Sequence, residues 1–215
     1  MRVRSKFIVV EGLEGSGKSS AVKKIADILR QKYGLVDLII TRDPGGTLLS
    51  ESLRNLIKKG VNDELITDHA ELLMFYAARV QLIEQVIKPS LSKNIWVISD
   101  RYDLSSHAYQ GGGRAIDVML LKALRNLVIK NFQPDLTFYL DVSPIVGLSR
   151  IFIRDTSLDR IERESLDFFN RVRSCYRLMA SKNHRIITID AHQTLQDVHK
   201  EIFIYLKKWL MVQGA

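Results

Sequence analysis

A glycine-rich segment near the start of the chain combines the residue types that bind phosphates. Residues 12–19 have the sequence Gly-Leu-Glu-Gly-Ser-Gly-Lys-Ser, a full match to G-x-x-x-x-G-K-[ST]. Glycines let the backbone wrap closely around phosphates, and a helix starting there adds the positive end of its dipole. We expect Lys18 to reach the terminal phosphates and the Ser19 hydroxyl to hold Mg²⁺. The motif predicts a nucleoside triphosphate site formed by Gly12, Leu13, Glu14, Gly15, Ser16, Gly17, Lys18, Ser19 and Ser20.

The phosphate-binding segment does not by itself name the reaction, because GTPases, helicases and kinases share it. The sequence lacks the guanine-binding pattern Asn-Lys-x-Asp, and its Asp-x-x-Gly match at residues 43–46 stands alone. A helicase or a motor requires a larger chain than 215 residues and a second acidic pair. The size of the chain favours a kinase that acts on a small molecule.

Asp100 and Arg101 directly follow the apolar run 95–99, so they are expected at the end of a strand. Asp100 suits an outer-sphere Mg²⁺ ligand or a carboxylate that orients an acceptor phosphate. Arg101 offers a bidentate fork for that phosphate. An ion pair at a strand end would explain the same two residues, but the phosphate-binding segment upstream favours a functional role.

Three further segments suit an acceptor, although each also has a plain structural explanation. Residues 41–47, Thr-Arg-Asp-Pro-Gly-Gly-Thr, form a turn-rich loop that a strand–helix connection would explain. Phe75 and Arg79 are four residues apart and share one helix face, where the ring could stack on a base and the guanidinium donate to a carbonyl. Core packing is the usual role of such an aromatic residue. Residues 110–114, Gln-Gly-Gly-Gly-Arg, are predicted to be a flexible turn that could fold around a ligand.

Arginines recur between residues 150 and 163, with Asp159 and Glu162 among them. During phosphoryl transfer, negative charge grows on the transferred oxygens, and a mobile arginine on a closing lid can stabilise it. Closure also excludes water, which would otherwise take the phosphoryl group. A solvated charged helix explains the segment equally well. The arginines in question are Arg150, Arg154, Arg160 and Arg163.

Strands and helices that could position these residues alternate along the chain. The predicted strands are Phe7–Glu11, Val36–Thr41, Ile95–Asp100, Leu136–Asp141 and Arg185–Asp190, and the predicted helices are 18–33, 47–59, 67–92, 116–130, 144–154, 158–181 and 194–212. Nearly continuous apolar runs are typical of parallel strands buried on both faces. The pattern predicts an α/β fold with a doubly wound parallel sheet. Ligands of such sheets bind beyond the carboxyl ends of the strands.

Composition and charge limit the class of protein. We predict a single compact domain over residues 1–215, because the hydrophobic fraction is 46% and no segment resembles a linker. The chain has only twelve glycines and four prolines. Cys175 is the single cysteine, which excludes internal disulfides and fits a reducing compartment and a core packing role. The basic start is followed by a short apolar run, but Glu11 interrupts that run, so the pattern does not match a signal peptide. No run approaches the ~18 apolar residues that a membrane-spanning helix needs. We therefore expect a soluble, cytoplasmic protein with no membrane contact.

The net charge of +8 suits an anionic partner. The basic residues are dispersed, with no block of five or six, so nucleotide phosphates fit better than a nucleic acid.

Taken together, the order and spacing of these segments resemble the bacterial thymidylate kinase family over nearly the whole chain. The shared motifs are GLEGSGKSS, TRDPGGT, LLMFYAARVQL, DRYDLSSHAYQGGGR, PDLTFYLDV and LDRIERE. The resemblance implies a P-loop NTPase fold with a five-stranded parallel sheet, helices on both faces and a short mobile lid at about residues 150–163. It further implies a homodimer that transfers the γ-phosphoryl group of ATP to dTMP, giving dTDP, with Mg²⁺ as cofactor.

The resemblance also implies roles for individual residues around the acceptor. Phe75 would stack on thymine, Arg79 would bond its carbonyl edge and Ser106 would meet its N3 edge. Tyr109 would pack near the deoxyribose C2′, and Glu14 would face the 3′-hydroxyl. The full acceptor site expected on this basis is Glu14, Arg42, Asp43, Pro44, Phe75, Arg79, Arg101, Ser106, Tyr109 and Gln110.

For catalysis, the resemblance implies that lid arginines act with the phosphate-binding lysine. The expected catalytic residues are Lys18, Asp100, Arg101, Arg150, Arg154 and Arg160, with Ser19 and Asp100 at the metal. Three positions depart from the family pattern: Asp43 replaces a common Glu, Ser19 and Ser20 replace a Thr pair, and residues 151–153 are apolar where arginines are common. The last departure leaves open which lid arginine acts.

Alternative functions differ in what they require of the acceptor side. A kinase for another mononucleotide or a deoxynucleoside is the nearest, because thymine differs from uracil by one methyl group, worth about 1 kcal/mol of burial. A nucleotide-binding switch or a scaffold with structural ATP would not need Asp100 and Arg101. Nucleic-acid binding is the weakest alternative. Consumption of ATP only in the presence of dTMP would separate the first two classes.

Overall fold

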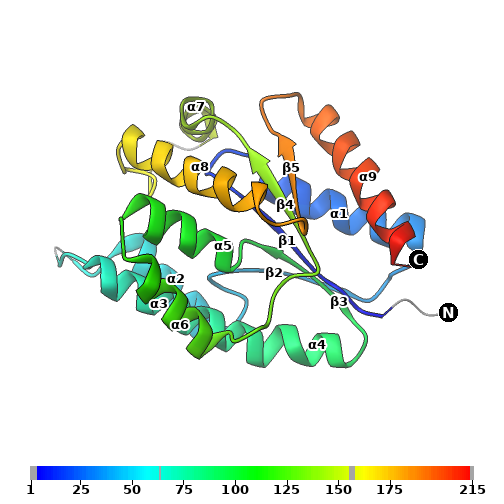
Figure 1. The fold of residues 1–215 in the computed structure, drawn as a ribbon, viewed down its shortest axis with the longest axis horizontal. Coiled ribbons are helices and arrows are strands. Elements are labelled where there is room, and N and C mark those ends of the chain that lie inside the picture. The colour runs from blue at the N-terminus through cyan, green and yellow to red at the C-terminus, as the bar shows by residue number, and fades with distance from the viewer. Residues whose placement is uncertain (1–3, 63, 155–157, 214–215) are drawn as a thin grey trace.

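A five-stranded parallel sheet forms the centre of the molecule in the computed structural model, which describes residues 4–62, 64–154 and 158–213 (Figure 1). The strand order is β2-β3-β1-β4-β5, and every neighbouring pair is parallel. The strands are β1 (Phe7–Gly12), β2 (Leu38–Arg42), β3 (Trp96–Asp100), β4 (Leu136–Asp141) and β5 (Ile186–Asp190). All five predicted strands are confirmed to within two residues at each end.

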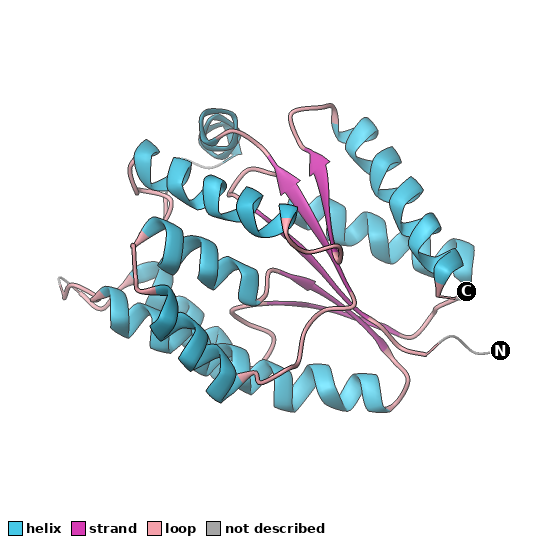
Figure 2. Cartoon of the chain, viewed as in Figure 1, coloured by secondary structure: helices cyan, strands magenta, loops and turns pink. Residues whose placement is uncertain are grey.

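Helical segments cover both faces of the sheet (Figure 2). They are α1 (Lys18–Tyr33), α2 (Leu48–Lys59), α3 (Asp68–Leu82), η1 (a π-helix, Ile83–Ile87), α4 (Lys88–Ser92), α5 (Asp103–Ser106), η2 (a π-helix, His107–Gly113), α6 (Val118–Val128), α7 (Pro144–Arg154), α8 (Leu166–Ser181) and α9 (Leu195–Val212). Helices α1 and α9 pack together on one face, whereas α4, α5 and α8 contact the other. The doubly wound α/β arrangement is therefore as predicted.

The central strand β1 shows how the two faces are filled. Its side chains alternate, so that Ile8 and Val10 join the apolar cluster with α1 and α9, while Phe7 and Val9 join the cluster with α3, α4 and α6. All four side chains are at most 1% exposed. A strand buried on both faces needs apolar residues at every position, which is why its sequence lacks the polar alternation of a surface strand.

Two sequence predictions about helices were wrong. Residues 158–165 do not start a helix: they form turns, and α8 begins at Leu166 with the Ser165 hydroxyl accepting from Phe168 N. Residues 110–113, predicted to be a flexible turn, belong to η2. Their glycines serve close packing, because a Cβ on Gly113 would lie 2.4 Å from the Phe168 ring and one on Gly112 would lie 2.7 Å from Cys175 Cβ. Neither glycine has the positive φ of a turn glycine.

Replacing Gly113 with Ala should therefore destabilise the protein by about 1–3 kcal/mol, because the new Cβ must displace an aromatic ring of α8. Gly111→Ala is the matched control in the same segment, since its Cβ would meet only the end of the flexible Leu121 side chain, at 2.9 Å. Thermal or urea unfolding measures both. An equal loss in the two variants would contradict this account of the packing.

Candidate active site

The phosphate-binding loop joins β1 to α1, and glycines hold it against the neighbouring strand and helix. Gly12 and Gly15 have φ of 148° and 70°, which disfavours other residues. A Cβ on Gly12 would lie 2.6 Å from the Leu140 carbonyl oxygen, and one on Gly15 would lie 2.1 Å from that of Gly147. The helix N-cap is Gly17, so no side chain covers the first N–H groups of α1. These N–H groups are suited to phosphate oxygens.

Lys18 and Ser19 place a cation and a hydroxyl at the mouth of this loop. The Lys18 ammonium donates to the Leu13 carbonyl oxygen at 2.7 Å. Burial, reinforced by the nearby Arg101 charge, lowers the pKa of Lys18 to about 8. The Ser19 hydroxyl lies 3.4 Å from Oδ2 of Asp100, and Asp100 Oδ1 is buried without a hydrogen-bond partner among the described residues.

This pair of oxygens fits a magnesium ion. Mg²⁺ prefers hard oxygen ligands and is usually held by one or two protein groups together with phosphates and water. Ser19 and Asp100 supply such a pair, and the buried Asp100 Oδ1 adds an oxygen free to accept. Within the described ranges, no cluster of three or more His, Cys, Asp or Glu side chains could form an all-protein metal site. The predicted metal ligands are thus compatible with an ion that arrives with a triphosphate.

Arg101 lies beside the loop because β1 and β3 are neighbours, and its backbone N–H donates to Val10 O at 2.9 Å. Its guanidinium donates to Glu14 at 2.6 Å, Ser105 Oγ at 3.0 Å and the Tyr109 hydroxyl at 3.2 Å. Burial opposes this charge, but the tyrosine and carboxylate groups around it outweigh burial and hold the pKa of Arg101 above its usual range. Arg101 is therefore a fixed, permanent cation.

Arg79 is the centre of a second buried polar cluster, and it is 1% exposed. It donates to Asp43 Oδ2 at 2.5 Å, to Ser106 Oγ at 2.9 Å and to Tyr102 O at 3.3 Å, and Asp103 lies 3.5 Å from Nη1. The two carboxylates raise the pKa of Arg79 despite burial. A guanidinium has five N–H donors, so these four contacts leave one on Nη2 for a ligand.

One cavity of about 400 Å³ joins the loop to the Arg79 cluster. The predicted residues that line it are Glu14, Gly15, Gly17, Lys18, Ser19, Ser20, Arg42, Asp43, Pro44, Phe75, Arg79, Asp100, Arg101, Ser106, Tyr109, Gln110 and Arg150. Gly12, Leu13 and Ser16 are not among its lining residues and lie buried in the base of the loop. The structure therefore brings most of the predicted site into a single space.

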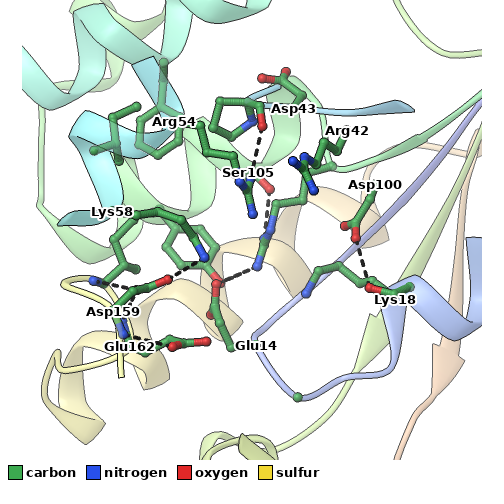
Figure 3. Close-up of a pocket in the computed structure, with 18 of the residues that line it drawn as sticks. Glu14, Lys18, Arg42, Asp43, Arg54, Lys58, Asp100, Ser105, Asp159 and Glu162 are labelled. Atoms are coloured by element: carbon green, nitrogen blue, oxygen red, sulfur yellow. Dashed lines mark hydrogen bonds and ion pairs between the residues drawn. The ribbon is translucent and has the colours of Figure 1, made fainter. Parts of the chain in front are cut away.

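Sequence reasoning missed part of the cavity wall. Arg54 and Lys58 lie four residues apart on α2, and both face the cavity (Figure 3). Burial and the charges of Arg42 and Arg101 lower the pKa of Arg54, whose Nη1 donates to Pro44 O at 3.0 Å. The i, i+4 spacing of the two cations was the only sequence signal. The remaining missed residues are Ile57, Ser105, Ile151, Asp159, Ile161 and Glu162.

The three predicted lid arginines differ in their surroundings. Arg150 lines the cavity and donates to Ala191 O at 2.9 Å and to Gly15 O at 3.4 Å. Arg160 is not among the lining residues: it donates to Ile57 O at 3.0 Å and pairs with the buried carboxylate of Glu71. Arg154 ends α7, and its side chain lies outside what the structure describes. A catalytic role for Arg160 stays a prediction that would require this pair to open.

The fold and the site define a class: a P-loop phosphotransferase in which the triphosphate loop opens into a cavity lined by arginines and an aromatic side chain. Comparison with known proteins narrows the class. The thymidylate kinase family model matches residues 10–202. Thymidylate kinases of Wigglesworthia glossinidia brevipalpis and Baumannia cicadellinicola subsp. Homalodisca coagulata are each 54% identical to the chain, and each match covers 98% of the chain and 99% of the relative.

A crystal structure of thymidylate kinase from Ehrlichia chaffeensis superposes with a TM-score of 0.76 at 35% identity, over 94% of this chain and 98% of that one. The chain belongs to the thymidylate kinase family, which phosphorylates dTMP to dTDP with ATP and Mg²⁺. The expected family, fold, reaction and phosphoryl donor are confirmed. Within the described ranges, every helix is too short or too polar to cross a membrane.

The lowered pKa of Lys18 predicts that ATP binding takes up protons. With a pKa of about 8, half of Lys18 is neutral in the empty enzyme at pH 8. Bound phosphates favour the charged form, so MgATP binding at pH 8 should take up ~0.5 proton. Titration calorimetry of MgATP binding in two buffers of different ionisation enthalpy measures the number of protons taken up. The uptake should persist in Lys23→Met, a control on the same helix, and disappear in Lys18→Met; uptake in the latter would assign the proton elsewhere.

Proposed function

We propose that the cavity holds dTMP with its phosphate toward Arg42, Arg54 and Arg101 and its base between Phe75 and Arg79. The observation that carries the proposal is the continuity of one cavity, which is lined by Lys18 of the phosphate loop as well as by Phe75 and Arg79. Such continuity is what in-line transfer between two bound nucleotides requires.

The base pocket supports thymine through the donors and acceptors it leaves unused. Arg79 keeps one N–H, which suits a carbonyl oxygen of the base and not an exocyclic amino group. Gln110 donates its amide N–H to Glu71 at 2.8 Å, so its carbonyl oxygen remains to accept the N3–H of a pyrimidine dione. The Ser106 oxygen accepts from Arg79 and keeps a proton to donate at the same edge. Phe75 supplies the stacking surface.

The sugar end is supported by Tyr109 and Glu14. The Tyr109 hydroxyl donates to Glu14, and the Tyr109 side chain is 5% exposed. A ring held in this way at C2′ leaves no room for a ribose hydroxyl, while Glu14 can accept from the 3′-hydroxyl. Both residues are also bonded to Arg101, so sugar and phosphate recognition share one rigid group.

Transfer needs little covalent chemistry from the protein, because the acceptor phosphate oxygen is already a nucleophile at pH 7. Lys18 and Arg150 would neutralise the charge that grows on the transferred group. Ser19 and Asp100 would hold Mg²⁺, which when bound neutralises charge on the phosphates. We propose that residues 150–163 act as a lid on a single domain spanning residues 1–215, and that closure excludes water from the transferred group.

We also propose that the enzyme is a cytoplasmic homodimer. Exposed apolar side chains lie on α2, α3 and α6, including Leu48 at 92%, Leu73 at 57% and Met119 at 65%. Helix α3 contacts both α2 and α6, so the three helices form a continuous surface. Residues 105–111 are mostly buried within the chain and offer less surface to a partner, so α6 is the better candidate beside α2 and α3. The free thiol of Cys175 fits a reducing compartment.

Substrate choice tests the base pocket directly. In a coupled ADP-release assay with ATP and Mg²⁺, dTMP should give the highest kcat/KM among dTMP, dUMP, UMP, CMP, AMP and GMP. UMP should be poorer than dUMP because of Tyr109, and dUMP poorer than dTMP by roughly fivefold, the worth of one buried methyl group. A higher kcat/KM for another nucleotide would overturn the assignment of Phe75, Arg79 and Gln110.

Arg54→Ala tests the end of the cavity proposed to bind the acceptor phosphate. Arg54 was not predicted as a site residue from the sequence. Removing a charged donor should raise KM for dTMP by about 10–100-fold and leave KM for ATP within about twofold. Arg30→Ala, at the far end of α1, is the matched control and should change neither constant. An unchanged KM for dTMP in Arg54→Ala would remove Arg54 from the phosphate site.

A further inference from the structure

Glu11 is a buried carboxylate that the proposed reaction does not use. It lies near the end of β1, is 0% exposed and is absent from the lining of the active-site cavity. Among the described residues it makes no ion pair within 4.0 Å, yet it accepts four hydrogen bonds. Oε1 accepts from Tyr102 N at 2.9 Å and Ser105 N at 3.3 Å; Oε2 accepts from Ser105 Oγ at 2.6 Å and the Tyr176 hydroxyl at 3.0 Å. Burial raises the pKa of Glu11 to about 7.

We propose that Glu11 is a positioning residue for Arg101 and acts through the hydroxyls of Ser105 and Tyr176. Both hydroxyl oxygens also accept from Arg101 Nη1, at 3.0 Å and 3.3 Å. A hydroxyl carries one proton, and it can accept from Arg101 only if that proton points elsewhere. In its ionised form Glu11 takes these protons, because a carboxylate is an acceptor only.

The hydroxyls of Ser105 and Tyr176 also lie 2.8 Å apart, so one can donate to the other. This contact does not weaken the argument, since in either arrangement both protons point toward Glu11 or the neighbouring hydroxyl and away from Arg101. Two hydroxyl acceptors, both oriented by Glu11, therefore bind Nη1 on one side. On the opposite side, Nη2 is bound by Glu14 and Tyr109. The guanidinium is held between the Glu14 carboxylate and the two hydroxyls that Glu11 orients, so it keeps one orientation.

The backbone contacts of Glu11 serve the same residue. Arg101 has a backbone φ of 70°, a left-handed conformation that residues other than glycine rarely adopt. Glu11 Oε1 binds the N–H of Tyr102, the next residue, and that of Ser105. The carboxylate thus supports both the turn that carries Arg101 and the orientation of its side chain. The inference rests on the proposed function, in which Arg101 binds the acceptor phosphate.

Glu11→Gln separates these two contributions. The amide oxygen can still accept from Tyr102 N, but the amide NH₂ would face two hydroxyls that were donors. At least one hydroxyl must then reverse and direct its proton at Arg101 Nη1, which is itself a donor. We expect KM for dTMP to rise and kcat/KM for dTMP to fall by about 10–100-fold, with KM for ATP within about twofold.

Asp135→Asn is the matched control. The Asp135 carboxylate accepts from Phe7 N at 2.8 Å, so it also supports β1, but at the opposite end from Arg101. The Asp135→Asn variant should therefore have unchanged KM values for dTMP and for ATP. If Glu11→Gln lowered kcat/KM equally for dTMP and ATP, its role would be general to the fold and the inference would be overturned.

A double-mutant cycle tests the route through the hydroxyls. In a variant that already carries Ser105→Ala and Tyr176→Phe, Glu11→Gln should change kcat/KM for dTMP by less than about twofold, because the two hydroxyls through which Glu11 acts are absent. A full effect of Glu11→Gln in that background would overturn the inference. If Glu11→Gln does not fold, Tyr176→Phe alone decides: KM for dTMP should rise about 3–10-fold, and an unchanged KM would overturn it.

Arg101→Ala distinguishes failure of this inference from failure of the proposed function. If Arg101→Ala raises KM for dTMP and Glu11→Gln does not, only the positioning role of Glu11 is overturned. If Arg101→Ala leaves the kinetics with dTMP unchanged, the acceptor-phosphate assignment itself is wrong, and the positioning role falls with it.

Discussion

The parallel pairing of β1 with β3 is the constraint on which both halves of the site depend. In this register Val10 is opposite Asp100, so the phosphate loop and the Asp100-Arg101 pair leave the sheet side by side. The bond from Arg101 N to Val10 O continues the pairing one residue beyond the strand. Donor and acceptor sites are therefore built on neighbouring strand ends, and their separation is set by the ~4.8 Å spacing of strands in a sheet. Loops need only supply the side chains.

The charges around this point are arranged before any nucleotide arrives. Arg79 is a fully buried cation and Arg101 a partly buried one, and each is compensated by carboxylates, hydroxyls or carbonyl oxygens. Arg54, by contrast, has only the Pro44 carbonyl as hydrogen-bond partner among the described residues, and its pKa is lowered. A partly buried cation with no carboxylate in hydrogen-bond contact is stabilised when an anion binds beside it. The two kinds of arginine differ accordingly: paired ones give orientation, and the unpaired one gains most from a phosphate.

What could be predicted from sequence follows from how local each feature is. The phosphate loop is specified by glycines within eight residues, and buried parallel strands by continuous apolar runs, so both were found. Arg54 and Asp159 reach the cavity only because α2 and the residues before α8 fold back over it, which no local pattern shows. Gly113 was misread because glycine has two uses: here its small size admits the Phe168 ring, whereas a turn would use its positive φ.

The contacts of the lid arginines indicate which of them can move. Arg150 is held by two backbone carbonyls, Gly15 O and Ala191 O, and exchange of such bonds for phosphate oxygens costs little. Arg160 is paired with Glu71, a carboxylate that is 1% exposed and also binds Gln110 and Arg114. Opening one partner of a buried pair costs several kcal/mol, at most about 3–5, and would disturb Gln110, which lines the cavity. This difference favours Arg150 as the arginine that reaches the transferred phosphoryl group, and it favours a structural role for Arg160 in the wall of the proposed base pocket.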